Sequence, residues 1–494
     1  MNRESTPSLK QRDIAPMARS DHRGYFAQKA VLPSELPSIM RRHIFTGSLG
    51  MVWANLITGI VYIYFGNAIG MTQFQWGILG AISMWVIAAQ PLGAVLGEHA
   101  GSRKVVWFWL ALADRVLRFI GIAGAYLLWR AGHPLAYLAL ISAVCLGSLV
   151  GNMANGPWFG WLATIIPQEV QGTFWGRRDS WISLVVIVVT VPSGLIMDLI
   201  PREGKLETAA AILMAASIIG FTDLLIHGTI PEPPFSPGVK RGPLSAVLNP
   251  LRNRRFRPWL IFNACWYFSW YLSGALCILY FMENLGFKNN LLGGMIAING
   301  VGLIGSLLTA RRAGRLVDRV GIQKVLFLSH LGWAVLPLIW LLATPPTAIF
   351  WIGLASLFGG VFPIAANNAA IKLVTRFPPS DEAAMYMAVS STVANISGGL
   401  ASLAAGSFLH LVGSWSFPIG RLVVSAFAML FIASGILRLA SVVVLVPRIR
   451  ERGAPPLDRR QLLLPMFFGL PAVKDRALSR PPTAGEAEEE RGEG

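Results

Sequence analysis

The sequence is poor in charged residues and has very little cysteine. Of its 494 residues, 14% are Asp, Glu, Lys or Arg, and three are cysteines. Cys145, Cys265 and Cys277 fall within apolar runs without disulfide or metal-ligand spacing, so we expect them to pack as small residues. The sequence also lacks a G-x-x-x-x-G-K-[ST] loop and an H-E-x-x-H pattern, which argues against direct ATP use and zinc-dependent catalysis. We therefore expect no enzyme, no cofactor and no metal site.

Apolar residues dominate instead. Hydrophobic residues make up 54% of the chain, 17 residues are tryptophan, and the mean hydropathy is +0.55. These values exclude a soluble domain and indicate a protein that crosses the membrane several times. The formal net charge of +17 is spread over loops and tails rather than gathered on one face. We expect it to set the orientation in the membrane and to contact anionic lipid headgroups, without a nucleic-acid partner.

Twelve apolar runs are long enough to cross the hydrocarbon core, which takes roughly 20 residues. They lie at 44–66, 75–97, 105–129, 135–160, 180–200, 207–229, 258–281, 291–311, 325–343, 347–371, 383–408 and 422–446. The sequence thus predicts an all-α integral membrane protein whose twelve transmembrane helices form two six-helix bundles, 44–229 and 258–446. Residues 230–257 are the predicted linker, 1–43 the N-terminal tail, and 447–494 a tail that we expect to be disordered.

Basic residues divide unequally between the two sets of turns. The turns that follow odd-numbered runs hold few of them, whereas the linker alone holds Arg252, Arg254, Arg255 and Arg257. The positive-inside rule therefore predicts that both termini and the linker lie in the cytoplasm. We expect the protein to reside in the cytoplasmic (inner) membrane.

A charged, glycine-bearing stretch occurs twice, about half a chain apart. Residues 314–324 read GRLVDRVGIQK, and residues 94–104 read AVLGEHAGSRK. A charged turn between two apolar runs must lie outside the hydrocarbon, because full charges and unpaired backbone groups are too costly inside it. A second repeat relates residues 154–174 to 366–386. The sequence therefore indicates two pseudo-symmetric halves.

Both copies resemble the loop signature G-x-L-x-D-R-x-G-x-x-K of the major facilitator superfamily. The later copy matches it almost throughout, and the earlier one departs at Ala94, Glu98 and His99. The resemblance covers residues 44–446. It implies a secondary transporter of two bundles that works by alternating access.

The resemblance also implies that the two loops close the cytoplasmic side, because each acid would face the start of a helix in the other half. For Asp318 that helix begins near Arg177 and Arg178, whereas Glu98 would meet only a helix N-terminus. The later copy is therefore expected to close more strongly. The gating residues that follow are Glu98, Gly101, Lys104, Arg177, Arg178, Asp318, Arg319, Gly321 and Lys324.

The resemblance further implies that the first, fourth, seventh and tenth runs line a central cavity. In the seventh run, polar and aromatic side chains recur at helical spacing and so share one face. The cavity candidates are Asn55, Tyr62, Asn152, Asn155, Trp158, Asn263, Trp266, Tyr267, Trp270 and Asn367. The alternative is that these amides join helices and the aromatic rings fill space. The four faces carry no lysine or arginine, which favours a neutral or amphiphilic solute.

Few ionisable residues lie at membrane depth. Asp114 and Arg118 are four residues apart in the third run and can pair on one helix face. The resemblance places that run at the periphery, which favours a structural pair. An ionisable group inside a membrane is also a candidate for proton or ion coupling. The sequence leaves both interpretations open.

We therefore expect a secondary active transporter that acts as a monomer, with a small organic solute, the lipid bilayer and, in the coupled case, protons as partners. An efflux pump for amphiphilic drugs or metabolites is one alternative. The drug-antiporter signature argues against it, because the fifth run has a single glycine after Pro192 instead of a pair. A receptor or scaffold on the same fold is the other alternative.

Overall fold

The computed structural model describes residues 25–234, 249–376, 383–413, 415–419 and 422–449. The first half contains α1 (Leu36–Leu56), α2 (Ile60–Ala68), α3 (Gln73–Trp85), η1 (Val86–Ala89), α4 (Gln90–His99), α5 (Arg103–Arg130), α6 (Ala136–Ile165), α7 (Gln168–Leu199), η2 (Arg202–Gly204) and α8 (Lys205–His227). The second half contains α10 (Arg257–Gly274), α11 (Cys277–Glu283), η3 (Phe287–Asn289), α12 (Leu291–Met295), η4 (Ile296–Gly300), α13 (Val301–Val320), α14 (Ile322–Ala334), α15 (Leu336–Trp340), η5 (Pro345–Thr347), α16 (Ala348–Arg376), α17 (Ala383–Val412), β1 (Ser416–Ile419), β2 (Leu422–Ser425), α18 (Ala426–Leu445) and η6 (Val446–Arg448). Most of the predicted tails and half of the predicted linker lie outside the described residues.

Eleven segments of the described chain are long and apolar enough to cross a membrane. Helix α5 is also long, with 28 residues, but it is not one of these eleven segments, and it carries charges along its length. Some crossings consist of two consecutive helices, because a glycine or a proline interrupts them. Gly59 separates α1 from α2, and Pro337 lies in the first turn of α15. The predicted all-α fold of two six-helix bundles is confirmed.

Several predicted ends differ from the structure. Helix α7 begins at Gln168 rather than at residue 180, and α13 continues to Val320 rather than ending at residue 311. Helix α1 begins at Leu36, well before residue 44, with Pro37 in its first turn, where a missing N–H is tolerated. The run predicted from residue 422 begins as strand β2, which pairs antiparallel with β1. β-branched Val423 and Val424 favour a strand there. Helix α18 starts only after Ser425, whose side chain accepts a hydrogen bond from the first turn of the helix.

The loop copies turn at a glycine. Gly101 and Gly321 occupy the same place in the two copies, and their φ angles are +65° and +97°. These angles are readily adopted only by glycine, because a Cβ atom would strain the backbone. The backbone geometry therefore accounts for the glycine in each copy.

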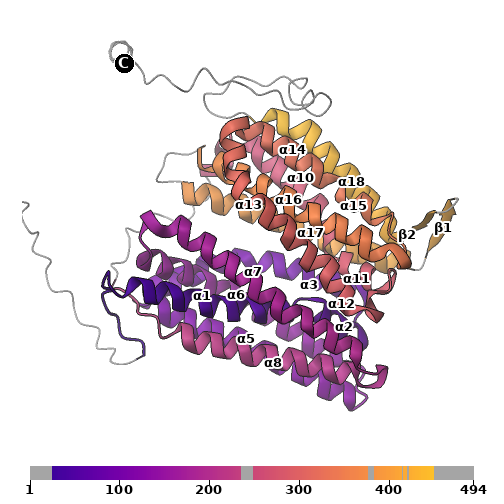
Figure 1. The fold of residues 1–494 in the computed structure, drawn as a ribbon, viewed down its shortest axis with the longest axis horizontal. Coiled ribbons are helices and arrows are strands. Elements are labelled where there is room, and N and C mark those ends of the chain that lie inside the picture. Colours follow the sequence, from indigo (N-terminus) through magenta and orange to yellow (C-terminus); the bar gives the residue numbers. More distant parts are fainter. Residues whose placement is uncertain (1–24, 235–248, 377–382, 414, 420–421, 450–494) are drawn as a thin grey trace, which may run out of the picture.

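The two halves share a core at one end of the molecule. We call the end that carries β1 and β2 the far side, and the end where residues 25 and 449 lie the terminal side. Figure 1 shows the halves one above the other and closest near the far side. A hydrophobic cluster there includes Leu79 from the first half and Ala405 from the second. Toward the terminal side each half has its own cluster, around Trp161 and Trp259 respectively.

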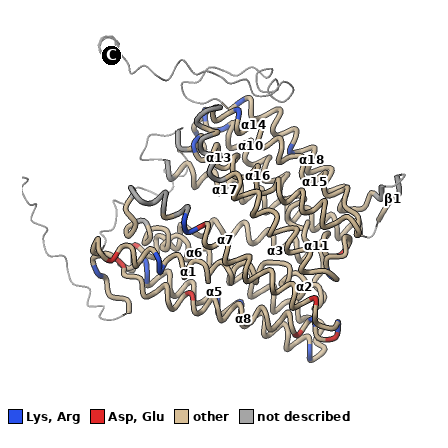
Figure 2. Tube along the Cα trace, viewed as in Figure 1, with Lys and Arg blue, Asp and Glu red and all other residues tan. Residues whose placement is uncertain are grey.

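Close backbone contacts and polar contacts join the halves toward the far side. Gly77 of α3 faces Gly406 of α17, where a Cβ atom at Gly77 would lie 2.8 Å from the opposite Cα. Asp198, at the end of α7, accepts hydrogen bonds from the backbone N–H groups of Leu291 and Leu292, each at 2.8 Å, and so caps α12. Figure 2 shows many Lys and Arg residues at the terminal side, whereas the middle of the bundle carries few charges.

Candidate functional site

A cavity of about 680 Å³ lies between the two halves. Helices α1 and α7 line it from the first half, and α10, α13, α14, α16 and α18 from the second. It contains four of the predicted cavity residues, namely Asn55, Tyr267, Trp270 and Asn367. Sites for small organic molecules typically measure roughly 300–1,000 Å³. We call this space the central cavity.

Aromatic rings form one wall of the central cavity. The ring of Trp270 lies 5.5 Å from that of Tyr267 and 4.9 Å from that of Trp333 on α14. Both contacts are edge-to-face, an arrangement that suits aromatic side chains and ligands. Trp333 and Arg438 of α18 also line this wall, although the sequence analysis considered only four runs. The sequence signal that could have identified Arg438 is an arginine at membrane depth.

Two predicted residues of α10, Asn263 and Trp266, line only a neighbouring pocket of about 290 Å³ within the second half, which Tyr267 borders as well. The Asn263 side chain donates to the carbonyl oxygen of Ser390 at 2.8 Å and joins α10 to α17. Trp266 is 1% exposed. Tyr62 lies elsewhere again, in the core that the halves share at the far side. None of these three predicted residues lines the central cavity.

Asn152, Asn155 and Trp158 line a third pocket, of about 470 Å³, inside the first half. The indole N–H of Trp158 donates to Nε2 of His227 at 3.2 Å. Because indole can only donate, Nε2 is the acceptor and the ring proton sits on Nδ1, which donates to Thr46 Oγ1 at 2.9 Å. His227 is thereby held as a neutral tautomer that links α1, α6 and α8.

Two buried ion pairs border this pocket. Arg118 Nε lies 2.6 Å from Asp114 Oδ1, the pair that the spacing predicted. Arg115 Nη2 lies 2.9 Å from Asp223 Oδ2 on α8. Each of the four side chains is at most 11% exposed, so each charge depends on its partner for compensation. Within the described chain, no group of three or more His, Cys, Asp or Glu side chains is arranged to hold a metal ion.

Helix α1 approaches these charges through two glycines. A Cβ atom at Gly50 would lie 2.7 Å from Asp223 Oδ2, and one at Gly47 would lie 3.1 Å from Arg178 Nε. Only a residue without a side chain allows so close an approach. Since Asn55 of the same helix lines the central cavity, α1 connects the two spaces.

The profile of the Major Facilitator Superfamily matches residues 44–402. The chain belongs to the major facilitator superfamily. Similar solved structures include a variant of the nucleoside transporter NupG (TM-score 0.63, 12% identity, covering 83% of this chain and 100% of that chain). The xylose transporter XylE from E. coli is also similar (TM-score 0.60, 13% identity, 85% and 100% covered), as is a bacterial homologue of the human lysosomal transporter Spinster (TM-score 0.52, 13% identity, 85% and 95% covered). At these identities the likeness shows the fold alone.

A search of curated proteins finds no match. The family and the apolar helices together make this protein an integral membrane transporter. Its substrate has to be argued from the cavity.

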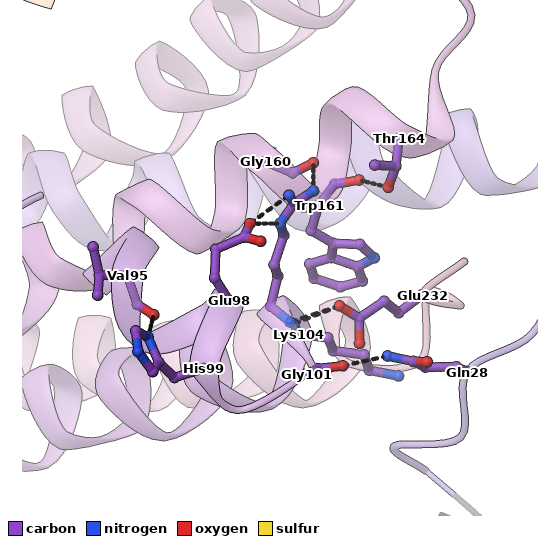
Figure 3. Close-up of polar contacts among 11 residues, drawn as sticks. Gln28, Val95, Glu98, His99, Gly101, Lys104, Gly160, Trp161, Thr164 and Glu232 are labelled. Carbon is purple, nitrogen blue, oxygen red and sulfur yellow. Dashed lines mark hydrogen bonds and ion pairs between the residues drawn. The ribbon is translucent and has the colours of Figure 1, made fainter. Parts of the chain in front are cut away.

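The first copy of the superfamily loop is bound within its own half (Figure 3). Glu98 Oε1 accepts hydrogen bonds from Arg103 Nε at 3.0 Å and Nη2 at 2.6 Å. Gln28, from the N-terminal segment, donates to the carbonyl oxygen of Gly101 at 2.7 Å. Glu98 therefore already has a cationic partner in its own half.

Helix α5, which follows this loop, is capped by the predicted linker. The carboxylate of Glu232 accepts hydrogen bonds from Ser102 Oγ at 2.6 Å and from the backbone N–H groups of Arg103 and Lys104 at 2.7 and 3.1 Å. A carboxylate suits the positive end of the helix dipole. The Lys104 ammonium donates to the carbonyl oxygen of Tyr25 at 2.6 Å. The N-terminal segment and the start of the linker thus hold this end of α5.

The second copy is described only in part, because the side chains of Asp318 and Arg319 lie outside the described residues. Lys324 lies in the first turn of α14. On the facing half, Arg178 Nη1 lies 3.3 Å from Asp179 Oδ1, and Arg177 is exposed. The contact expected between Asp318 and Arg178 stays a prediction.

Proposed function

We propose that the protein, acting as a monomer, carries a small organic solute across the cytoplasmic membrane by alternating access, with the central cavity as the solute site. The position of the cavity supports this proposal, because it lies between halves that share a core toward the far side and have separate cores toward the terminal side. Rocking of the halves about such a cavity would expose the solute to one side at a time.

The terminal side is proposed to be cytoplasmic, on the distribution of basic residues. Single cysteines at Gly238 and Ser380 should then react with an impermeant maleimide only from the cytoplasm. A cysteine at Asn289 should react only from outside. Labelling of the Asn289→Cys protein from the cytoplasm alone would refute this orientation.

Uptake into proteoliposomes tests transport itself. Purified protein is first screened by thermal shift against metabolites and drugs, since a ligand at 100 times its Kd adds about 2.7 kcal/mol. Radiolabelled hits are then offered to proteoliposomes, with protein-free liposomes as the control. Ligands that stabilise the protein and are never carried would favour a receptor, and transport only toward the outside would favour an efflux pump.

Two tryptophans of α10 provide a matched pair for the solute site. Trp270 lines the central cavity, whereas Trp266 lies in the neighbouring pocket and is almost fully buried. Trp270→Ala should weaken solute binding several-fold, because a stacked aromatic contact contributes about 0.5–1.5 kcal/mol. Trp266→Ala should lower stability with less effect on the Kd. Unchanged affinity in the Trp270 variant would remove that residue from the site.

Proton coupling through Asp114 is the finer part of the proposal. Its pairing with Arg118 beside the pocket of the first half supports a carboxylate whose proton occupancy affects helix packing. Asp114→Asn should abolish accumulation driven by a pH gradient and retain solute exchange without a gradient. Retention of both activities would leave the pair a structural one.

A further inference from the structure

Among the residues that the structure describes, one buried arginine of the second half has no acidic partner. Arg438 lies in the middle of α18 and is 1% exposed. The sequence of the second half has four acidic residues, Glu283, Asp318, Asp381 and Glu382, of which Glu283 ends α11. Among the described side chains, Arg438 bonds only to neutral groups. Among the described residues, its charge therefore has no counter-charge from its own half.

Backbone carbonyls hold the Arg438 guanidinium in place. Nη1 donates to the carbonyl oxygen of Trp333 at 3.3 Å, and Nη2 donates to that of Trp270 at 3.2 Å and to Ser273 Oγ at 2.8 Å. The Trp333 carbonyl is available because Pro337, four residues on, has no N–H to donate. Carbonyl dipoles orient the guanidinium but do not neutralise it. Its Nε has no partner among the described residues.

The same arginine belongs to the wall of the central cavity. It lies there with Trp270 and Trp333, whose ring centroids are 4.9 Å apart. Of the described residues that line the cavity, Arg438 is the only charged one, and the others are apolar, aromatic, amide or hydroxyl side chains. The cavity thus combines one positive charge with an aromatic wall.

From this arrangement we infer that the solute is an amphiphilic monoanion, an aryl or alkyl carboxylate whose carboxylate binds Arg438 and whose apolar part packs against Trp270 and Trp333. The inference rests on the proposed function, because it takes the central cavity as the solute site. The Nε–H of Arg438, which has no partner among the described residues, can donate a charge-assisted hydrogen bond to a carboxylate oxygen. A single negative charge would compensate the buried cation, whereas a neutral solute would leave it uncompensated and a dianion would bring an excess charge.

Binding requires a small rearrangement of the wall. Because only 1% of Arg438 is exposed, a carboxylate can reach its Nε only after a neighbouring side chain moves. Changes of side-chain rotamer are common when partners bind. We expect Trp270 to move, since it lines the cavity and its carbonyl oxygen is bound by the same arginine.

Matched pairs of probes test the inference on the unmodified protein. Full-length protein in lipid nanodiscs is titrated calorimetrically with 2-naphthoate and 2-naphthamide, and with octanoate and octanamide. Each pair keeps the apolar part and removes the charge. The carboxylate should bind at least about tenfold more tightly than its amide, as expected for a hydrogen bond between charged groups. Equal affinity within both pairs, or no binding of any probe, overturns the inference.

Variants assign the preference to one residue. Arg438→Gln should remove the preference for the carboxylate and leave the affinity for the amide unchanged. Arg438→Lys keeps the charge, should retain part of the preference, and serves in place of the first variant if that one fails to fold. Arg448→Gln is the control, because Arg448 is exposed beyond the end of α18. A wild-type preference in the Arg438→Gln protein overturns the assignment.

Uptake of labelled 2-naphthoate separates this inference from the proposed function. Preferential binding of the carboxylate without uptake above protein-free liposomes would refute transport and leave Arg438 as the anion site. If the amide is taken up as fast as the carboxylate, and both exceed uptake by protein-free liposomes, the role of Arg438 is refuted and transport is retained.

Discussion

The two halves of this transporter differ in the partners that they provide for a buried arginine. In the first half, Arg115 of α5 meets Asp223 of α8 at 2.9 Å. In the second half, α18 is the sixth crossing, as α8 is in the first, and it carries the buried cation Arg438, whereas α8 carries the buried acid Asp223. Arg438 is held by two carbonyl oxygens and a hydroxyl. A duplicated fold can therefore keep its arrangement of helices while changing which buried charges are balanced.

A balanced pair and an unbalanced charge have different consequences for function. The ion pairs of the first half compensate themselves and need no ligand, so they suit helix packing and the proposed coupling. Arg438 lines the central cavity and leaves room for a counter-charge from the solute. Under the inferred anion site, charge recognition belongs to the second half.

The largest effect should follow from breaking the Arg115–Asp223 pair. Asp223→Ala leaves a guanidinium buried without its partner, which costs about 3–5 kcal/mol of unfolding free energy. Unfolding of the purified protein by heat and by denaturant measures this loss. A variant as stable as wild type would show that the first half does not depend on the pair.

The double variant Arg115→Met with Asp223→Leu removes both charges and should recover most of that loss. Asp179→Ala is the exposed control. The Asp179 side chain is 68% exposed beside Arg178, and exposed pairs contribute at most about 1 kcal/mol. Equal losses in the buried and exposed variants would contradict the distinction between them.

The next effect concerns the carbonyls that hold Arg438. Arg438→Met should cost about 1–3 kcal/mol, because it removes the charged donor of the buried Trp333 carbonyl and leaves it with the backbone N–H of Val335. The loss should be smaller than for Asp223→Ala, since no charge is left alone. Pro337→Ala in the same protein restores an N–H four residues after Trp333 and should recover part of it. A double-mutant cycle measures the coupling, and strictly additive losses would mean that the two residues do not share this carbonyl.

The fold was predictable because the length of a crossing and the charge of a loop are local properties of the sequence. The pair of Asp114 and Arg118 was predictable for the same reason, since the residues are four apart on one helix. The pair of Arg115 and Asp223 was not, because it joins residues 108 positions apart and requires the packing of α5 on α8. The periodicity of a sequence predicts which residues share one face of a helix. It does not predict which other helices that face contacts.

The central cavity shows the same limit. Trp266 and Trp270 share the predicted face of α10, but they line different pockets, because a helix face is wide enough to border two spaces. Trp333 and Arg438 were missed because the resemblance directed attention to four crossings only. In the structure, α14 and α18 reach the cavity wall as well. The absence of cations from four predicted faces therefore did not mean a cavity without charge.

A smaller effect should follow from removing Asp198, an acidic residue of the first half that contacts the second half. Asp198 caps α12 through the N–H groups of Leu291 and Leu292. Asp198→Ala should cost about 1 kcal/mol and shift the halves several-fold toward opening at the far side. The labelling rate of a cysteine at Ser183, which lines the central cavity, measures this from that side. Glu207→Ala, an exposed acid at the start of α8, is the control and should leave the rate unchanged.

The smallest effect should come from a substitution in the first loop copy, which belongs to the first half. The second loop copy provides the comparison with the other half. The side chain of Glu98 is 34% exposed and pairs with Arg103 of its own half, which also bonds to the Gly160 carbonyl oxygen. A partly exposed pair of this kind contributes at most about 1 kcal/mol. Glu98→Gln should therefore change the labelling of a cysteine at Asn155 from the terminal side by less than about fivefold.

The second loop copy should matter more, because its acid is expected to meet Arg178 across the halves when the terminal side closes. Asp318→Asn should raise the labelling rate of the Asn155→Cys protein further than Glu98→Gln does. Exchanging the charges, by Asp318→Arg together with Arg178→Asp, should restore part of the closure, since the attraction survives with its sign reversed. If Asp318→Asn leaves the rate unchanged while the protein still reaches the membrane, the second copy does not hold the terminal side closed.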